Sequence, residues 1–369
     1  MAHLVFLTST PPGVADGSGT WVGISVLRDA IVALGHQVTL IARPSDHGRE
    51  TTLSRVIFNI RARSRLRRLR HDVLIGFDLD GVFAGTGAFR VAAIKGVIAD
   101  EALHERGITR RVLGVQARLE SRNVRGADRV IATSAYSSQR IIRLYGAEPA
   151  RISVVPELID LATWERSLRA ARLVEHDSPR ILCVAHLYPR KGVQTLLRAF
   201  ARLRPPAVLR IVGIGPEKSR LEHLARTLGI EDRVHFLGLL PFHDLTTEYR
   251  NATVFALPSE QEGFGIVFLE AMASSLPVVA GRAGAVPEVV EEGTTALLID
   301  PSDDVALAQS LETLLDRPDM RTSMGSAGRA RVRAYDAPIV ARQFLDAIGV
   351  VGDGVNVAGS MPRTFSPEL

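Results

Sequence analysis

The segment Pro258–Ala280, PSEQEGFGIVFLEAMASSLPVVA, indicates the fold class because it joins two strands through a glycine loop and a helix. The strands are predicted at Val254–Leu257 and Val278–Ala280, which are short and apolar. The helix between them is predicted to begin near Ile266. A buried strand, a glycine loop, a helix and a second buried strand form the repeating unit of a doubly wound α/β fold.

The same alternation of short strands and longer helices extends along the whole chain of 369 residues. In the first half the predicted strands are Leu4–Leu7, Val38–Ile41, Val73–Ile75, Val91–Ile94, Val130–Ala132 and Ile152–Val155. In the second half they are Ile181–Ala185, Leu209–Val212, Val234–Phe236, Val254–Leu257, Val278–Ala280 and Leu297–Ile299. Continuous apolar strands separated by helices indicate parallel sheets that are covered on both faces. We therefore predict an α/β protein of two Rossmann-like domains whose parallel sheets face a central cleft.

A polar segment without a predicted strand separates the two series of strands. It covers residues 159–178, and Pro179 follows it directly before the next buried strand. We therefore predict an N-terminal domain over residues 1–158, a linker over this segment and a C-terminal domain over residues 179–334. The final residues, 350–369, lack periodicity, and we expect them to form a disordered tail.

The composition is that of an ordinary globular protein, with 46% hydrophobic and 23% charged residues. Lysine and arginine number 45 against 40 aspartates and glutamates, which gives a net charge of +5. This balance suits a nucleotide, a phospholipid surface, a nucleic acid or an acidic substrate, and does not choose among them. Cys183 is the single cysteine and lies in an apolar run, so an intrachain disulfide is excluded and a cysteine-based zinc site is not expected.

Membrane contact is predicted only at the surface. No apolar stretch approaches the ~18 residues that span a bilayer, and the N-terminus lacks the basic region of a signal peptide. We expect a cytoplasmic protein that binds no nucleic acid. Residues 61–70, RARSRLRRLR, together with Leu53, Val56, Ile57 and Ile60, predict an amphipathic helix. It is either an ordinary solvated helix or a peripheral contact with the inner face of an anionic membrane.

Two glutamates in the first segment are candidates for sugar recognition. Glu262 lies in the glycine loop, and Glu270 lies about one turn into the helix, so both carboxylates are expected to point into the same cleft. Carboxylates accept hydrogen bonds from pairs of hydroxyl groups, as in a hexose or a ribose. Gly263 and Gly265 permit close approach of the backbone to a ligand, and the free amides at the start of the helix suit an anion or a hydroxyl.

The combined pattern, EGFG followed by LEAMA and PVVA, resembles that of the family 4 retaining glycosyltransferases, which have the GT-B fold. The resemblance implies transfer of a sugar from a UDP-, GDP- or ADP-sugar to a hydroxyl of a glycan, a lipid or a small molecule. The anomeric configuration of the sugar is expected to be retained. It implies that Glu262 and the backbone of Gly263, Phe264 and Gly265 contact the donor sugar, and that Glu270 contacts the donor ribose. No tightly bound cofactor and no metal ion are expected.

Further landmarks of the family follow in order in the C-terminal half. Lys191 and Arg190 match the segment that binds the donor diphosphate, and a cation beside a helix N-terminus is a natural phosphate site. His186 stands where the family usually has arginine, which leaves Arg190 to supply that contact. Gly213 and Gly215 resemble the family's glycine turn near the nucleotide base.

The N-terminal half resembles the family more loosely. Gly17 and Gly19 lie in the first glycine loop, which in the family is near the donor phosphates, although an ordinary strand–helix turn explains them equally well. Lys95 occupies the place of a family histidine and is a candidate for electrostatic catalysis. Asp100 and Glu101 are candidates for orienting the acceptor hydroxyl.

The C-terminal end of the chain also matches the family. Residues 335–349 resemble the terminal helix that returns to the N-terminal domain.

Three alternatives to a glycosyltransferase remain open from the sequence. Asp78 and Asp80, in VLIGFDLDG, resemble the first motif of the Mg²⁺-dependent haloacid-dehalogenase phosphatases. The same pair resembles the metal motif of GT-A enzymes, which the two-domain pattern argues against. A GT-B protein that binds nucleotide without turnover, and a GT-B epimerase or phosphorylase, share the fold and not the reaction.

Overall fold

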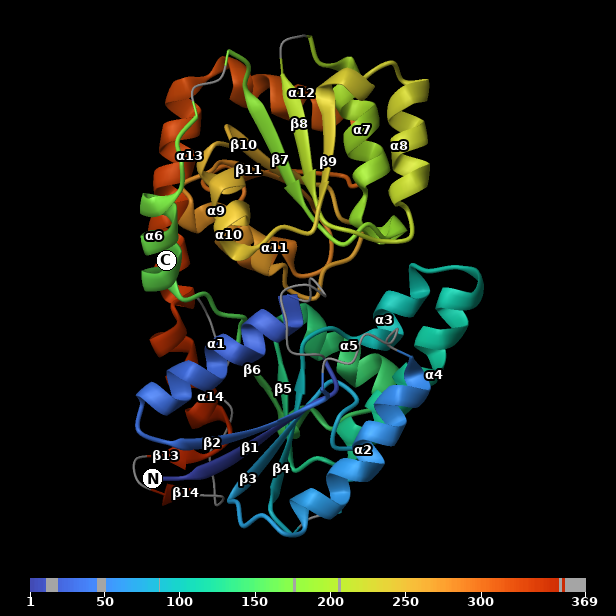
Figure 1. Ribbon diagram of the computed structural model, residues 1–369, viewed down its shortest axis with the longest axis vertical. Helices are drawn as coiled ribbons and strands as arrows, with labels where there is room; N and C mark the ends of the chain where they lie inside the picture. The colour runs from blue at the N-terminus through green and yellow to red at the C-terminus, as the bar shows by residue number, and fades with distance from the viewer. Residues whose placement is uncertain are drawn as a thin grey trace. The chain divides into compact units, whose positions relative to one another are not determined.

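The computed structural model describes residues 1–10, 19–44, 51–85, 87–174, 177–204, 207–351 and 354–355. The chain forms two compact units, each built on a six-stranded parallel sheet (Figure 1). Unit 1 comprises Met1–Leu158 together with Ala337–Leu369, and unit 2 comprises Ile159–Asp336. The chain therefore leaves unit 1 once and returns to it once.

Unit 1 has the strand order β2-β1-β3-β4-β5-β6, with every neighbouring pair parallel. Its strands are β1 (His3–Thr8), β2 (Gln37–Ala42), β3 (Val73–Phe77), β4 (Phe89–Ile94), β5 (Arg129–Ala132) and β6 (Ile152–Val154). Its helices are α1 (Gly19–Ala33), α2 (Thr52–Leu66), α3 (Ile98–Leu103), α4 (Gly107–Gly126), α5 (Ala135–Tyr145), the short η2 (Pro149–Arg151) and α14 (Ala337–Ala347).

Helices cover both faces of this sheet because its strands are apolar on both sides. Along β1, Leu4 and Phe6 pack into the cluster with α1 and α14, whereas Val5 and Leu7 pack into the cluster with α2. This alternation follows from the two-residue period of a strand. In Figure 1, α1 and α14 lie on one face of the sheet, and α2, α4 and α5 lie on the other.

Unit 2 repeats this architecture with the strand order β12-β11-β10-β7-β8-β9. Its strands are β7 (Arg180–Val184), β8 (Val208–Val212), β9 (Val234–Gly238), β10 (Val254–Leu257), β11 (Val278–Gly281) and β12 (Ala296–Ile299). Its helices are α6 (Leu161–Ala170), η3 (Pro189–Lys191), α7 (Val193–Arg202), α8 (Lys218–Thr227), η4 (Glu231–Arg233), α9 (Phe242–Arg250), α10 (Ile266–Ala273), α11 (Val286–Val289), α12 (Asp304–Asp316), α13 (Pro318–Arg331) and η5 (Val332–Tyr335). Cys183 is fully buried in β7, where burial raises the pKa of its thiol to about 12.

The predicted α/β class and all twelve predicted strands are confirmed, with small differences at the strand ends. The predicted linker contains α6, which belongs to unit 2, and α14 belongs to unit 1. At the start of the predicted tail, β13 (Val350–Val351) pairs antiparallel with β14 (Gly354–Val355). The rest of the tail lies outside the described residues. Across the ranges that the structure describes, none of the helices is long and apolar enough to cross a bilayer.

Candidate functional site

The candidate site lies where the strand order of unit 2 reverses. β7 has β10 on one side and β8 on the other, so the loops that follow these strands diverge at the carboxyl edge of the sheet. Open α/β sheets bind ligands in the crevice at such a point. The sequence candidates of the C-terminal half come from the loops after β7, β8 and β10 and from the start of α10. The topology therefore gathers residues that are far apart in the sequence.

A buried ion pair joins two of these candidates. The Nζ atom of Lys191 lies 2.6 Å from Oε1 of Glu262. The hydroxyl of Ser259 donates to the same Oε1 over 2.9 Å. The side chains of Lys191 and Glu262 are 15% and 8% exposed, so bulk water screens this pair only weakly. The structure thus places the predicted phosphate-binding cation directly beside the predicted sugar-binding carboxylate.

Gly192 makes this approach possible. Its φ of 66° is in the left-handed region, and a Cβ atom here would lie 2.1 Å from the carbonyl oxygen of Pro258. The backbone amide of Glu260 also donates to the carbonyl of Arg190 over 2.7 Å. Only glycine therefore allows the segment containing Lys191 to pack against the loop after β10.

The glycine turn after β8 packs against the loop after β7. A Cβ atom on Gly213 would lie 1.9 Å from the carbonyl oxygen of Ala185, the residue before His186. A Cβ atom on Gly215 would lie 2.5 Å from the carbonyl oxygen of Leu187. The guanidinium of Arg190 stacks over the ring of its neighbour Tyr188, with Cζ 4.9 Å from the ring centroid.

The EGFG loop ends at the first turn of α10. Gly265 has a φ of 92° and stands immediately before the helix. The ring of Phe264 is buried against Tyr335, so this residue anchors the loop with its side chain. Gly263 precedes it in the same loop. This arrangement is compatible with the predicted backbone contacts to a sugar.

Glu270 is held by a tyrosine. The hydroxyl of Tyr249 donates to Oε2 of Glu270 over 2.7 Å. Tyr249 is fully buried, with its ring edge-on to Trp164 and stacked on Phe255. Burial raises the pKa of Glu270 to about 7, and the hydrogen bond from Tyr249 acts in the opposite direction. One carboxylate oxygen is thereby fixed by the protein.

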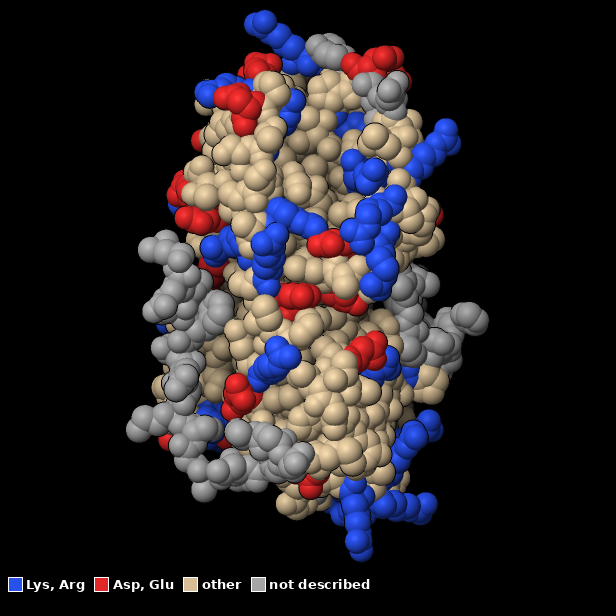
Figure 2. Space-filling model, turned by 90° about the vertical axis from the view of Figure 1, so that its left-hand side faces the viewer, with Lys and Arg blue, Asp and Glu red and all other residues tan. Residues whose placement is uncertain are grey.

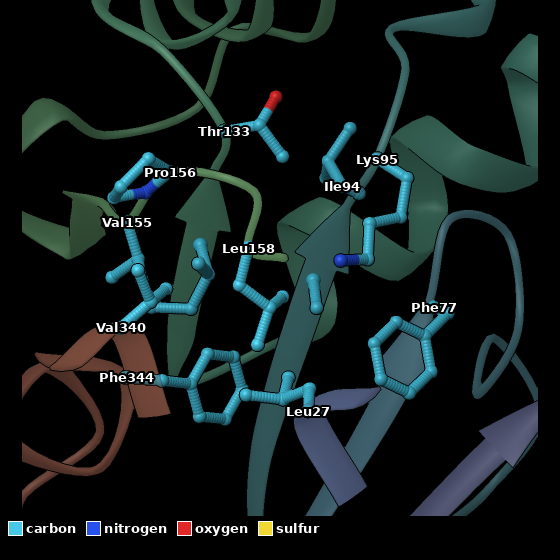
Figure 3. A pocket seen from close by; sticks show the side chains of 12 residues that line it. Leu27, Phe77, Ile94, Lys95, Thr133, Val155, Pro156, Leu158, Val340 and Phe344 are labelled. Carbon is cyan, nitrogen blue, oxygen red and sulfur yellow. The ribbon is translucent and has the colours of Figure 1, made fainter. Parts of the chain in front are cut away.

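In unit 1, Lys95 follows β4 and forms an ion pair with a buried glutamate. Its Nζ atom lies 2.8 Å from Oε2 of Glu157 and 5.8 Å from the centroid of the Phe77 ring. Figure 3 shows its amine pointing into a small pocket, which Leu27, Leu158 and Phe344 line with apolar carbon. The pocket volume of about 20 Å³ admits a water molecule and no sugar.

The remaining candidates of unit 1 are partly accounted for by local structure. Asp100 is fully buried on α3, where it accepts hydrogen bonds from Tyr136 (2.7 Å) and from Nε of Arg140 (2.6 Å). Glu101 lies beside it, with a carboxylate oxygen against Gly96. Their role toward an acceptor therefore stays a prediction. Gly19 is the first residue of α1, and Gly17 lies outside the described residues.

Asp78 and Asp80 have structural partners. Asp80 is fully buried and accepts hydrogen bonds from the backbone and hydroxyl of Ser9 and from Asn59. Oδ1 of Asp78 accepts the backbone amide of Lys95 over 2.8 Å, and burial raises its pKa to about 6. In the described part of the chain, no group of three or more His, Cys, Asp or Glu side chains is placed to hold a metal ion. The geometry thus assigns both aspartates to loop structure.

The basic run of residues 61–70 differs from the predicted amphipathic helix. Helix α2 ends at Leu66, so only part of the run 61–70 is helical. The side of α2 that faces the core carries Arg55 and Asn59 beside Ala62 and Leu66. Of the aliphatic residues predicted to form the apolar side, Val56 is partly buried, whereas Leu53, Ile57 and Ile60 are exposed. Arg55 and Asn59 turn inward because they are partners of the buried carboxylate of Asp80.

The residues that hold the candidates in place were not predicted from the sequence. These are Ser259 and Tyr249 in unit 2, and Glu157 in unit 1. Ser259 follows β10 directly, and a polar residue at the carboxyl end of a strand could have been noted. Tyr249 has no such signal because it reaches Glu270 from the neighbouring helix α9.

Comparison with known proteins agrees with this geometry. The family described as "Glycosyl transferases group 1" matches residues 165–331, and "Glycosyltransferase Family 4" matches residues 17–163. A GDP-mannose-dependent alpha-(1-6)-phosphatidylinositol monomannoside mannosyltransferase of Mycolicibacterium smegmatis is 34% identical over 285 residues, which are 72% of this chain and 74% of that protein. The chain belongs to glycosyltransferase family 4. This glycosyltransferase takes its sugar from a nucleotide sugar.

This glycosyltransferase is also similar to two further known proteins. The D-inositol 3-phosphate glycosyltransferase of Corynebacterium glutamicum is 33% identical over 274 residues, which are 70% of this chain and 64% of that protein. The sucrose-phosphate synthase of Thermosynechococcus elongatus superposes with a TM-score of 0.79 at 21% identity, over 94% of this chain and 98% of that one. The fold is therefore GT-B, and the phosphatase and GT-A alternatives are discarded.

Proposed function

We propose that this glycosyltransferase moves a hexose from a nucleoside-diphosphate sugar to the hydroxyl of an inositol-bearing lipid, with retention of the anomeric configuration. The observation that carries the donor side is the pair of Lys191 and Glu262 at 2.6 Å, held at the point where the strand order reverses. The printed names of two relatives, which act on phosphatidylinositol monomannoside and on D-inositol 3-phosphate, support the acceptor class.

The donor is expected to separate this ion pair. Its diphosphate carries more negative charge than one carboxylate, so Lys191 turns to the phosphate oxygens, with Arg190 beside it. Glu262 is then released to accept hydrogen bonds from the sugar hydroxyls. As the glycosidic bond breaks, Lys191 stabilises the growing charge on the leaving diphosphate. A donor phosphate oxygen takes the proton of the acceptor hydroxyl, and this step needs no metal ion.

The other candidate residues have supporting roles in this proposal. Glu270 accepts hydrogen bonds from the donor ribose, and Gly213 with Gly215 borders the base. Lys95 is our candidate for electrostatic catalysis in unit 1, where Glu157 holds it. We also propose that the enzyme works in the cytoplasm as a peripheral protein at the inner face of the membrane, since a lipid acceptor is presented there.

Radiolabelled GDP-mannose tests this proposal first, with phosphatidylinositol vesicles and with soluble inositol phosphate as acceptors. Labelled lipid together with release of nucleoside diphosphate only when the acceptor is present supports transfer to lipid. Label in the soluble product alone assigns the acceptor to inositol phosphate. Absence of transfer with GDP-, UDP- and ADP-hexoses to either acceptor contradicts the proposal. The anomeric configuration of the product, read by NMR, tests retention.

Donor affinity is expected to depend on pH through Glu270. Its pKa is raised to about 7, so the ionised form that accepts ribose hydrogen bonds grows as the pH rises through that value. Calorimetric titration with a nucleotide sugar should therefore show weaker binding at about pH 6 than at about pH 8, by up to tenfold. Tyr249→Phe removes a hydrogen bond that favours the ionised form, so its binding midpoint should move to higher pH. A wild-type affinity that is flat over this range excludes the role of Glu270.

A further inference from the structure

Helix α4 carries an open groove that contains three arginines. The groove has a volume of about 620 Å³ and is lined by Gly107, Arg110, Arg111, Gly114, Val115 and Arg118. These residues follow one another at helical spacing, so they share one side of α4. The two glycines leave the floor of the groove open between the arginine side chains.

The guanidinium groups in this groove have no partners within the described ranges of the chain. Arg110, Arg111 and Arg118 form neither a side-chain hydrogen bond nor an ion pair there, and all three are exposed. On the side of the molecule shown in Figure 2, by contrast, lysine and arginine are mixed with aspartate and glutamate. That view looks onto the side away from α2 and α4 (Figure 1). The groove therefore presents positive charge that the described protein does not neutralise.

Exposed aliphatic side chains lie next to the groove on the same helix. Ile108, Val112 and Val115 are 79%, 41% and 47% exposed. These residues are spaced four and then three positions apart, so they form a stripe along one side of the helix. A stripe of this kind beside arginines is typical of a helix that lies in the interface of a bilayer.

Helix α2 extends this aliphatic surface. It packs beside α4, and the amide of Gln116 donates to the hydroxyl of Thr52 over 3.0 Å. Its outward side exposes Leu53, Ile57 and Ile60 by 67%, 39% and 57%. These aliphatic groups point outward, whereas Arg55 and Asn59 on the same helix point inward to Asp80. We call the exposed aliphatic residues of both helices, together with the arginine groove, the α2–α4 face.

We propose that the α2–α4 face binds an anionic phospholipid surface, with headgroup phosphates in the arginine groove and the aliphatic side chains among the acyl-chain ends. Arginine matches the geometry of phosphate oxygens through paired hydrogen bonds. The aliphatic stripe favours a bilayer over a nucleic acid or an acidic protein, because only the bilayer offers phosphate and hydrocarbon at adjoining depths. This inference rests on the proposed lipid acceptor and moves the main contact from residues 61–70 to α4.

Co-sedimentation of the full chain with vesicles tests the inference without donor or acceptor turnover. Binding is expected to vesicles of phosphatidylcholine mixed with phosphatidylglycerol, and not to phosphatidylcholine alone. Each arginine near an anionic surface contributes roughly fivefold, so the triple variant R110Q/R111Q/R118Q should bind about a hundredfold more weakly. The variant I108S/V112S/V115S should also bind more weakly, although it keeps every charge.

A variant with the same loss of charge on the neighbouring segment is the matched control. R61Q/R65Q/R68Q alters three exposed arginines of the basic run and should weaken binding by no more than about fivefold. The inference is overturned if wild-type protein binds neither vesicle, or if this control loses binding while R110Q/R111Q/R118Q retains it. Binding of an acidic protein or an oligonucleotide in preference to the anionic vesicles also overturns it. Nucleotide affinity, measured on the same variants, should stay at the wild-type value, which separates this test from that of the donor site.

Discussion

Replacing Lys191 by alanine is expected to lower kcat/KM for transfer by about 100- to 1,000-fold, the usual loss when one group that stabilises developing charge is removed. Lys191 is the cation nearest to the candidate sugar-binding carboxylate, and Gly192 holds its segment against the loop after β10. The same change should weaken binding of free nucleoside diphosphate by roughly 10- to 100-fold, because a hydrogen bond to a charged group is lost. Steady-state kinetics and calorimetric titration measure the two effects separately.

The matched control for this change is Lys218→Ala. Lys218 lies on α8 of the same unit, its side chain is 42% exposed, and Glu222 is its ion-pair partner at 3.7 Å. An exposed pair of this kind contributes little, so activity and diphosphate affinity should match the wild type. Unchanged diphosphate affinity in Lys191→Ala would remove Lys191 from the phosphate site.

Replacing Glu262 by glutamine is expected to lower transfer by about 100-fold, with a smaller effect on nucleotide binding. Glutamine keeps the shape of the side chain and still accepts the hydrogen bond from Ser259, but it loses the charge that orients the sugar hydroxyls. Alanine is a poorer test because Glu262 is buried and paired, so alanine leaves Lys191 without its partner and costs stability as well. Transfer kinetics together with a thermal unfolding curve distinguish these effects.

Glu260→Gln is the control for Glu262, since Glu260 is exposed on the same loop, two residues earlier. It should retain wild-type kinetics. Transfer by Glu262→Gln at the wild-type rate would contradict the assignment of the sugar site, and loss of both nucleotide binding and thermal stability would assign Glu262 to structure alone.

The sequence predicted the sheets well because their signal is local. Each strand is a short apolar run followed by a turn, and burial on both faces leaves no other place for such runs. The loop from Pro258 to Gly265 was equally visible, since glycines are needed where backbones approach closely. The Lys191–Glu262 pair could not be read from spacing, because it depends on β7 and β10 being neighbours in the sheet.

The partners of the site residues could not be predicted either, because they also depend on which elements are neighbours in the fold. Tyr249 reaches Glu270 from another helix, and an aromatic residue on a helix is usually taken as core. The orientation of α2 was not predictable from its own residues either. An apolar stripe normally turns inward, but the buried carboxylate of Asp80 draws Arg55 and Asn59 to the core side instead.

The most direct test of the central claim is a thermal-shift comparison of UDP, GDP and ADP on the wild-type protein and on Lys191→Ala. A ligand that binds only the native state raises the apparent Tm, by linkage. We predict that one diphosphate raises the Tm of the wild type selectively and that this shift is lost in Lys191→Ala. No shift with any of the three, or a shift that persists undiminished in the variant, would contradict a nucleotide-sugar site built around Lys191 and Glu262.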